Sequence, residues 1–494
     1  MVRPRIRSLR RLLAGVAGSV LALPGTAIVP AAAGVVMHPT VSDFVQINAS
    51  NTPPTEAQCF SVGRRCFTPQ AIQSAYHVGP LYQQGINGKG VTIAIVDSFG
   101  SDTIAHDLHV FDQAFKLQPM CGEEGVTCAA GMPTFSQLHV QGSPPTNSIP
   151  GQNSTDQETH SLWALEVTLD VETSHAMAPM ANILLVTTPT AETLGVQGFP
   201  DMMKAEKVVV DNHLASVISQ SFASAEEAFN STQSLLNLRD SFIAAAANGV
   251  TVLGSSGDGG TANVIKEPVK NPTLIPFPSV EWPASDPLVT GVGGTYLCTN
   301  PTAGTNDPRT ITAGPPGKCA ANPTQAEVGW TFSGGGFSHV FSKPSYQNTL
   351  PAGSTPIDGM RGVPDIGLQA SSGTGALVFI SLPPDGLSGL RCGTAPCSTG
   401  WFDIGGTSLS CPQWAALVAM ADQLHGSGLG LINPKLYSLA SNPATYAANF
   451  FDVTTGKNQA DPTVPGYPAT KGWDPITGLG TPNAASLVHA LAGK

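Results

Sequence analysis

Short apolar runs alternate with longer amphipathic patterns along most of the chain. Four of these runs are rich in β-branched residues: 91–96, 182–188, 215–221 and 249–258. Helical periodicity lies between them, for example over 161–177 and 235–249. Strands that alternate with helices predict an α/β fold, in which helices cover both faces of a doubly wound, mostly parallel sheet.

Polar residues with catalytic potential stand where such runs end. Asp97 follows the first run, Asp258 closes the fourth, and Ser408 opens an apolar helical pattern after a Gly-Gly turn. Ligands of doubly wound sheets bind beyond the carboxyl ends of the strands. We therefore expect the active site at that edge of the sheet.

The composition narrows the classes of partner. Charged residues make up 12% of the 494 residues, Lys and Arg together number 23, and the formal net charge is −11. A surface poor in Lys and Arg argues against nucleic acid as a partner. A chain with few charges also has few salt bridges to lose when carboxylates are protonated, which suits an acidic medium.

The first 33 residues have the pattern of an export signal. Five arginines precede an apolar stretch from Leu12 to Leu23, and an A-x-A pattern predicts cleavage after Ala33. The Arg10-Arg11 pair leaves the twin-arginine export route open. The apolar stretch is shorter than the roughly 20 residues that span a bilayer, and we expect no stable membrane anchor in the mature, secreted chain.

Eight of the nine cysteines fall into neighbouring pairs within loop-like sequence, which favours disulfides in an oxidising compartment. The ninth, Cys411, lies in the apolar pattern after Ser408, where a buried thiol is expected rather than a nucleophile. The four pairs are Cys59 with Cys66, Cys121 with Cys128, Cys298 with Cys319, and Cys392 with Cys397.

A serine nucleophile at Ser408 needs a base. Glu166 and Asp170 lie four residues apart in a helical pattern, so they share one face beside an apolar stripe. Two carboxylates there repel each other unless they share a proton or serve a purpose, and the alternative is an ordinary solvated helix face. With Glu166 bound to Ser408 and Asp170 bound to Glu166, the three form a nucleophile, a base and an orienting acid.

Asp258 lies in the segment "SSGDGG" at 255–260. An ionised Asp beside a developing oxyanion would repel it, whereas a protonated Asp can donate a hydrogen bond to it. This role requires acidic conditions. Taken alone, the same segment also fits an ordinary turn.

Together these segments resemble the sedolisin family of serine-carboxyl peptidases. The resemblance implies a subtilisin-like α/β fold and a secreted endopeptidase that acts in acid through an acyl-enzyme on Ser408. It also implies a catalytic triad of Glu166, Asp170 and Ser408, with Asp258 as the oxyanion acid. Asp97 matches a second acidic position, and a strand-capping role is open for it. The matching segments are "EVTLD", "GVTVLGSSGDGG", "WTFSGGGFS", "RGVPDI", "GGTSLSCPQWAAL" and "GWDPITGLGTP", over about 75–494.

The resemblance further implies one structural calcium ion near the C-terminus. Oxygen ligands without His or Cys suit Ca²⁺ on chemical grounds as well. The implied ligands are the side chains of Asp452 and Asp474 and the backbone carbonyls of Val453, Thr470 and Gly472.

We expect three regions: an export signal at 1–33, a short leader at 34–74 in place of a full-length prodomain, and a peptidase domain at 75–494. The polar, Pro-rich and weakly periodic sequence from Gly34 to about Gln70 predicts that the leader is flexible or loosely packed. Protein or peptide substrates should bind as an extended strand against 219–224 and 333–336, because glycines permit close approach of the backbone. Phe222 stands where some family members have tryptophan. A monomer is expected.

Two alternatives stay open at this point. A neutral peptidase of the subtilisin type would need His160 or His175 to approach Ser408. A catalytically inactive peptide-binding protein could have kept the same fold, although it would have no need for all four of the residues Glu166, Asp170, Asp258 and Ser408.

Overall fold

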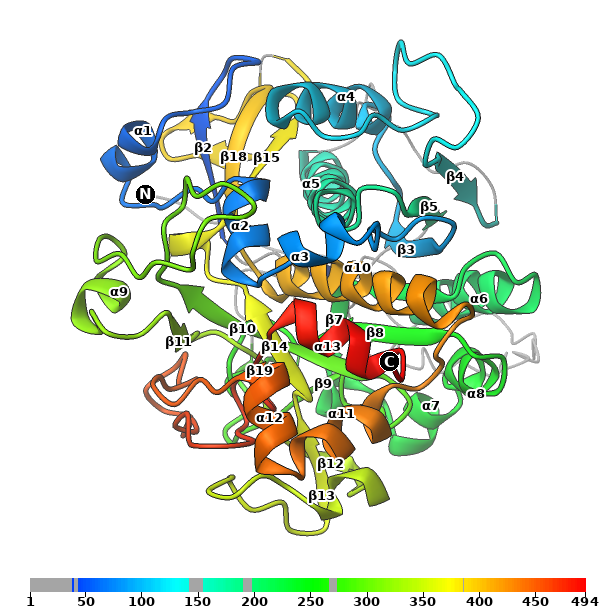
Figure 1. Ribbon diagram of the computed structural model, residues 1–494, viewed down its shortest axis with the longest axis vertical. Helices are drawn as coiled ribbons and strands as arrows, with labels where there is room; N and C mark the ends of the chain where they lie inside the picture. The colour runs from blue at the N-terminus through cyan, green and yellow to red at the C-terminus, as the bar shows by residue number, and fades with distance from the viewer. Residues whose placement is uncertain (1–37, 40–42, 142–153, 190–197, 266–272, 385) are drawn as a thin grey trace, which may run out of the picture. The chain divides into compact units, whose positions relative to one another are not determined.

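A computed structural model describes residues 38–39, 43–141, 154–189, 198–265, 273–384 and 386–494 (Figure 1). These residues belong to one unit, Ala33–Lys494. The expected export signal at 1–33 lies outside the described residues. Among the helices that the structure describes, none has the length and hydrophobicity that a membrane span requires.

The central sheet has eight strands, and its strand order is β11-β10-β8-β6-β3-β5-β4, with β14 also paired to β10. All of its strand pairs are parallel except β10 with β11. The predicted doubly wound, mostly parallel sheet is therefore confirmed. The bounds are β3 Thr92–Ser98, β4 Phe135–His139, β5 Asn182–Thr188, β6 Val217–Gln220, β8 Thr251–Ser255, β10 Thr290–Leu297, β11 Glu327–Gly329 and β14 Ile366–Gln369.

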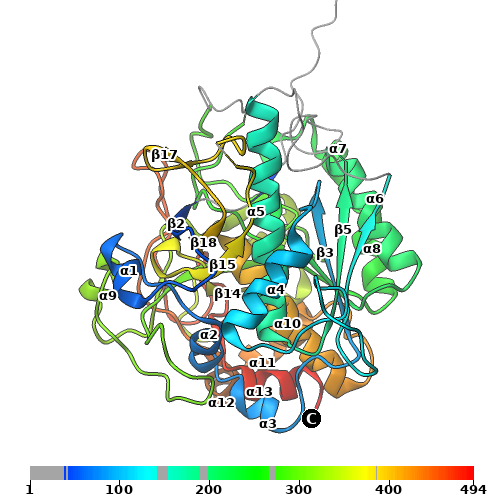
Figure 2. The same ribbon diagram turned by 90° about the horizontal axis from the view of Figure 1, so that it is seen from above.

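Helices cover both faces of this sheet, which explains why its inner strands carry apolar side chains on both sides. In β3, Ile93 and Ile95 pack with α5 (Ser154–Met177) and α10 (Thr407–His425). Ala94 and Val96 pack with α6 (Gly198–Asp211) and α8 (Asp240–Ala247) on the other face. Figure 2 shows α5 and α6 on opposite sides of β3 and β5.

Segments that precede the predicted peptidase domain join its sheets. Strand β2 (Phe44–Asn48) pairs with β18 (Gly400–Ile404), which also pairs with β15 (Ala376–Ile380). Strand β1 (His38–Pro39) pairs with β7 (Phe222–Ala225), whose other neighbour is β9 (Glu281–Trp282). The leader is therefore folded into the domain through these strands, and the expectation that it is loosely packed is wrong for β1 and β2. The leader contains helix α1 (Glu56–Ser61), α2 (Pro69–Ala75) crosses its predicted end, and α3 (Gly79–Gln83) follows it.

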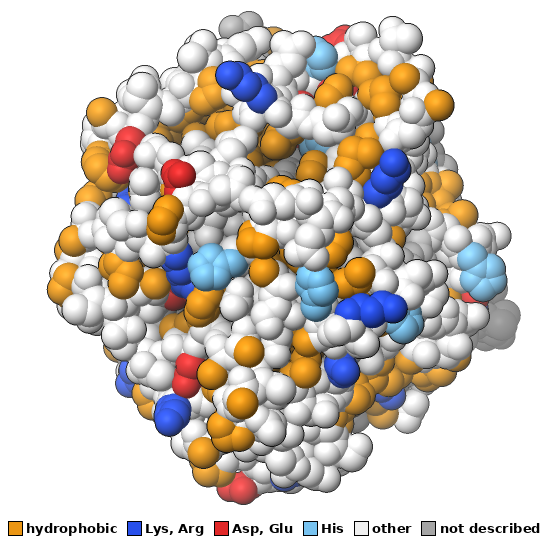
Figure 3. All heavy atoms as spheres, viewed as in Figure 1, with side chains coloured by type: hydrophobic (Ala, Val, Ile, Leu, Met, Phe, Trp, Pro, Cys, Tyr) orange, Lys and Arg blue, Asp and Glu red, His pale blue; other side chains and the backbone are white. Residues whose placement is uncertain are grey.

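The four predicted disulfides are present, and Cys411 is a buried free thiol, as expected. Basic side chains are few on the face shown in Figure 3, where blue groups stand apart from one another.

The remaining helices are α4 Ile104–Phe115, α7 Thr232–Leu236, α9 Gly317–Ala321, α11 Asn433–Ala440, α12 Pro443–Asn449 and α13 Ala484–Leu491. The remaining strands are β12 Gly336–Ser342, β13 Met360–Val363, β16 Arg391–Cys392, β17 Ala395–Pro396, β19 Phe450–Phe451 and β20 Thr481–Pro482.

Candidate active site

Two long helices carry the predicted triad. Glu166 and Asp170 lie one turn apart on α5, and Ser408 is the second residue of α10, which packs along α5. Both carboxyl groups are fully buried, so the alternative of a solvated helix face is wrong. Gly406 precedes α10 with φ of 122°, a conformation that favours glycine and sets the turn into the helix.

Burial and mutual repulsion dominate the electrostatics around Glu166. Burial raises its pKa well above the ordinary value, the charge of Asp97 adds to the shift, and the hydroxyl of Ser408 lowers it. Neither carboxyl oxygen of Glu166 makes a short, well-aligned hydrogen bond with another described residue. Catalytic hydrogen bonds are often long before a substrate binds, so this arrangement is compatible with the predicted pairing of Ser408 with Glu166.

Asp170 and Asp97 complete the buried acid cluster. Burial raises the pKa of Asp170, and the charges of Asp97 and Glu166 raise it further. Asp97 lies in β3, and burial raises its pKa to about 8. Three neighbouring carboxyl groups in a nonpolar interior cannot all be ionised at once, so this cluster retains protons.

Asp258 is fixed at the start of α10. Its Oδ1 accepts hydrogen bonds from the backbone N–H of Thr407 at 2.8 Å and from the Thr407 hydroxyl at 2.9 Å. The N–H of Gly257 in turn donates to that hydroxyl at 3.1 Å. The charge of Asp258 is one of those that raise the pKa of Glu166, so the structure brings Asp258 to the same site.

The two histidines of the subtilisin-type alternative are engaged elsewhere. His160 stacks on Phe99 with ring centroids 4.0 Å apart. His175 forms a buried pair with Asp112 at 2.9 Å. The group that faces Ser408 is therefore the carboxyl of Glu166, and the structure favours a carboxylate base over an imidazole.

Both the sequence and the fold are similar to those of known proteins. The chain is 30% identical over 441 residues to kumamolisin from Bacillus sp. (strain MN-32), covering 88% of this chain and 65% of kumamolisin. The structure matches Pseudomonas sedolisin, a serine-carboxyl proteinase complexed with two molecules of pseudo-iodotyrostatin, with a TM-score of 0.62 and 25% identity. That match covers 87% of this chain and 99% of sedolisin.

The chain is thus similar to the sedolisin family of serine-carboxyl peptidases. It is also 29% identical over 364 residues to sedolisin from Pseudomonas sp. (strain 101), covering 73% of this chain and 53% of that protein. The chain thus spans about half to two thirds of the length of these curated relatives. No family model matches the chain.

Two residues of the candidate site were not singled out in the sequence. The hydroxyl of Ser221, directly after β6, lowers the pKa of both Glu166 and Asp170, so it faces both carboxyl groups. Thr407 holds Asp258. The only sequence signal for them was position, since each lies at the carboxyl end of a strand or beside the nucleophile.

The two predicted substrate edges differ. The N–H of Gly334 donates to the carbonyl of Gly257 at 2.8 Å, so the glycine segment 333–336 lies beside the loop that carries Asp258. A Cβ atom at Gly334 would lie 1.9 Å from the Ser256 carbonyl oxygen, which explains the glycine. At the other edge, β7 is already paired with β1 and β9. A substrate strand must displace β1 to use that edge.

Phe222, the residue that replaces tryptophan, is fully buried in β7. Its ring centroid lies 6.3 Å from that of Phe199, in a cluster that includes Trp282. The ring therefore serves the packing behind the site and carries no hydrogen-bond donor toward the acids.

The predicted calcium ligands lie near the C-terminus, away from the triad in sequence. Asp474 is buried, and burial raises its pKa to about 7, with the charge of Asp452 contributing to the shift. Within the described part of the chain, no hydrogen bond reaches the carbonyl oxygens of Val453, Thr470 or Gly472. Two adjacent carboxyl groups and three unbonded carbonyls suit a hard cation.

No group of three or more His, Cys, Asp or Glu side chains suited to a metal occurs among the described residues. The predicted calcium site has two carboxylates and relies on carbonyl oxygens for the rest, so it is a different kind of site. Its donor set fits Ca²⁺ because every candidate donor is an oxygen.

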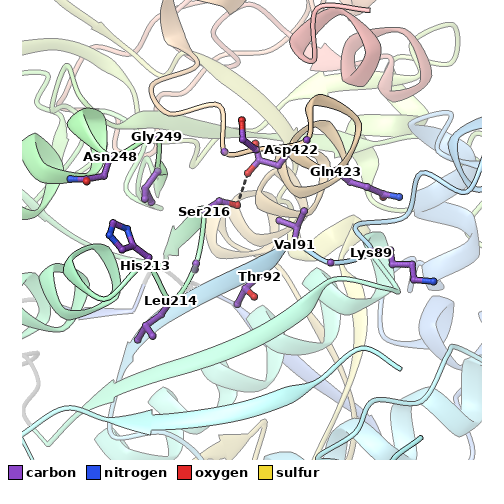
Figure 4. Close-up of a pocket in the computed structure, with 16 residues that line it drawn as sticks. Lys89, Val91, Thr92, His213, Leu214, Ser216, Asn248, Gly249, Asp422 and Gln423 are labelled. Carbon is purple, nitrogen blue, oxygen red and sulfur yellow. Dashed lines mark hydrogen bonds between the residues drawn. The ribbon is translucent and has the colours of Figure 1, made fainter. Parts of the chain in front are cut away.

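A cavity of about 710 Å³ lies at the opposite edge of the sheet (Figure 4). Thr92, Ser216 and Val250 line it at the amino ends of β3, β6 and β8. The hydroxyl of Ser216 donates to Asp422 at 2.6 Å inside it. None of the triad residues lines this cavity, so it is separate from the candidate active site.

Proposed function

We propose that this protein is a serine-carboxyl endopeptidase that hydrolyses peptide bonds in protein or peptide substrates under acidic conditions. The observation that carries the proposal is the buried pair of Glu166 and Asp170 beside Ser408, with Asp258 held at the start of the same helix. The similarity of the chain to kumamolisin and of its fold to sedolisin supports it.

Each residue has one task in the proposed reaction. The Ser408 oxygen attacks the substrate carbonyl carbon while Glu166 accepts the hydroxyl proton. Asp170 orients Glu166, and protonated Asp258 donates a hydrogen bond to the oxyanion of the tetrahedral intermediate. The intermediate collapses to an acyl-enzyme as Glu166 returns the proton to the leaving amine. Water then repeats the sequence and releases Ser408.

The distribution of protons in the acid cluster makes Glu166 the base. Asp97 and Asp170 repel a third charge, so protons remain in the cluster in acid. Glu166 is faced by the hydroxyls of both Ser408 and Ser221, whereas Asp170 is faced by Ser221 alone. Of the two carboxyl groups on α5, Glu166 therefore has more hydroxyl donors to stabilise its charged form, and it lies next to the nucleophile.

One structural calcium ion is part of the proposal. The carboxylates of Asp452 and Asp474 and the carbonyls of Val453, Thr470 and Gly472 would hold it. A divalent cation would neutralise two adjacent acids and cross-link the C-terminal loops. The chemical steps above do not involve it.

We also propose that the protein is secreted and that its chain has three regions. Four disulfides fit an oxidising compartment outside the cell. We assign 1–33 to an export signal, 34–74 to a leader and 75–494 to the peptidase domain, which acts as a monomer.

Degradation of an unfolded protein between about pH 2 and pH 8, with the cuts mapped by mass spectrometry, tests the function. We expect internal cuts in acid that fade toward neutrality and vanish in Ser408→Ala. The matched control is Glu172→Gln, because Glu172 is a buried acid on the same helix whose carboxylate accepts the Phe379 N–H at 3.1 Å. Absence of cleavage at every pH, with peptide binding retained, would favour the inactive binding protein instead.

A further inference from the structure

A second group of titratable side chains lies near the far end of α5, outside the active site. His175 of α5 and Asp112 of α4 form a pair at 2.9 Å, with side chains that are 0% and 2% exposed. The His175 Nε2 also lies 2.8 Å from the carbonyl oxygen of Gln118, in the loop that follows α4. Two helices and one loop therefore meet at this imidazole.

The same loop sends an acid into the group. The side chain of Glu123 is fully buried, accepts the backbone N–H of Met120 and lies 3.2 Å from the His109 Nδ1 of α4. The disulfide Cys121–Cys128 closes the loop around Glu123. His109, Asp112, Glu123 and His175 thus connect the loop 116–134 to both helices.

The protonation states of these groups favour the closed arrangement in acid. Burial opposes a charge on His175, but the charge of Asp112 and its hydrogen bond outweigh it and raise the pKa of His175. Burial and the neighbouring charge of Asp112 raise the pKa of Glu123 to about 8. In acid the group therefore holds a protonated His175 paired with the carboxyl group of Asp112, and a neutral Glu123.

Rising pH removes both protons. A group whose pKa is raised by folding binds its proton more tightly in the folded state, so its stabilisation is present at low pH and is lost as pH rises through the folded pKa. For His175 and Glu123 this loss falls between weakly acidic and weakly alkaline pH. Once both protons are lost, a charged Glu123 is buried beside the carboxyl group of Asp112, and the positive charge of His175 is gone.

Neighbouring groups do not offset that charge. Glu172 lies on the same helix, and burial together with the charges of Asp107 and Asp112 raises its pKa well above the ordinary value, so it stays neutral and offers no positive charge. The remaining pair, His106 with Glu124, is exposed, with side-chain exposures of 44% and 64%. The packed elements α2 and β15 contribute no charged side chain.

We propose that His109, Asp112, Glu123 and His175 form an acid-dependent clasp, which holds the loop 116–134 on α4 and α5 in acid and releases it toward neutral pH. The clasp is independent of the proposed peptidase chemistry. It nevertheless acts on α5, the helix that carries Glu166 and Asp170, so it would limit the enzyme to acidic surroundings by structure as well as by chemistry.

Amide hydrogen exchange over the loop tests the clasp directly. The measurement uses Ser408→Ala to prevent self-digestion, at pH values from about 4.5 to about 8, with rates corrected for the intrinsic pH effect. We expect protection of 117–134 to fall by about tenfold per pH unit once the clasp begins to lose protons. Uniform protection across this range would overturn the proposal, whatever the outcome of activity assays.

A pair of neighbouring substitutions sharpens the test. Glu123→Gln keeps the shape of the protonated acid and removes one of the two titrating groups, so the release should move to higher pH. Glu124→Gln is the matched control, because its partner His106 is exposed, and it should leave the release pH unchanged. An unchanged release pH in Glu123→Gln, or an equal shift in Glu124→Gln, would contradict the clasp.

Discussion

Two clusters of buried acids lie along α5, one around Glu166 and Asp170 and the other around His175 toward the end of the helix. Burial raises the pKa of carboxyl groups in both. The partners differ: hydroxyl groups face the first cluster, and an imidazole pairs with the second. A carboxylate that is bound only by hydroxyl groups can still accept a proton. A carboxylate that is paired with an imidazolium is stabilised in its charged form and accepts a proton less readily.

The comparison shows that buried acids alone do not mark a catalytic site. Around Ser408 the remaining charge stands next to a nucleophile, so it can act as a base. Beside His175 the charge of Asp112 is neutralised, so it contributes to stability and to its pH dependence. Loss of a residue from the first cluster should therefore change rate, and loss from the second should change folding.

The largest expected effect is the loss of peptide hydrolysis when the residue next to the first acid cluster is replaced. Ser408→Ala should lower peptide hydrolysis by at least about 10³-fold with the fold intact, because it removes the nucleophile. Adding Glu166→Gln should cost little more, since the two act as one unit. Ser410→Ala, whose hydroxyl donates to the Gln369 carbonyl at 2.9 Å, is the control on the same helix and should remain active. Hydrolysis that persists in Ser408→Ala would refute the assignment.

Asp258→Asn should lose about 10- to 100-fold in kcat at the acidic optimum, less than complete loss of an oxyanion donor, because the amide still donates. The amide does not titrate, so the decline of activity toward neutral pH should become shallower. The pH profile of kcat measures both effects. A decline as steep as that of the wild type would show that Asp258 does not need its proton.

Calcium removal should lower stability more than initial rate. An ion that binds only the folded state stabilises it by about 2.7 kcal/mol at a hundredfold excess over its Kd. Melting curves with added Ca²⁺ and with excess chelator, at about pH 5 where ordinary carboxylates are ionised, measure the effect. Asp474→Asn should melt at the chelated temperature with or without Ca²⁺. A melting temperature that chelator leaves unchanged in the wild type would argue against the site.

The smallest expected effect concerns β1. Deletion of 34–42 should lower KM by a few-fold, roughly the 0.6–1 kcal/mol of a lost strand contact, because β1 pairs with an edge of β7 that a substrate strand could use. The value of kcat should stay the same, since β1 holds none of the reacting groups. Steady-state kinetics on a peptide substrate separate the two constants. An unchanged KM would mean that substrates bind only along 333–336.

Much of the fold and the candidate site could be predicted from local sequence. The period of the apolar runs predicted the parallel sheet, and the spacing of Glu166 and Asp170 predicted a shared face of α5. Both features depend on neighbours in the chain. The family resemblance was confirmed by the comparisons with kumamolisin and sedolisin.

Long-range partners could not be predicted in this way. The sequence left His175 as a possible base for Ser408. Its partner Asp112 lies on another helix, and no local pattern links the two residues. The leader looked loosely packed because β2 gains its structure from β18, far along the chain. The contacts of Ser221 with Asp170 and of Thr407 with Asp258 join segments that are far apart in the chain, so only the folded structure reveals them.

The rate of acylation of Ser408 tests the central claim, that Glu166 is the base. It can be measured as the first-turnover burst with a chromogenic peptide ester in wild type, Glu166→Gln and His160→Gln at the acidic optimum. We predict a burst rate at least about 10³-fold slower in Glu166→Gln and within a few-fold of wild type in His160→Gln. A near-normal burst in Glu166→Gln, with its loss in His160→Gln, would contradict the account.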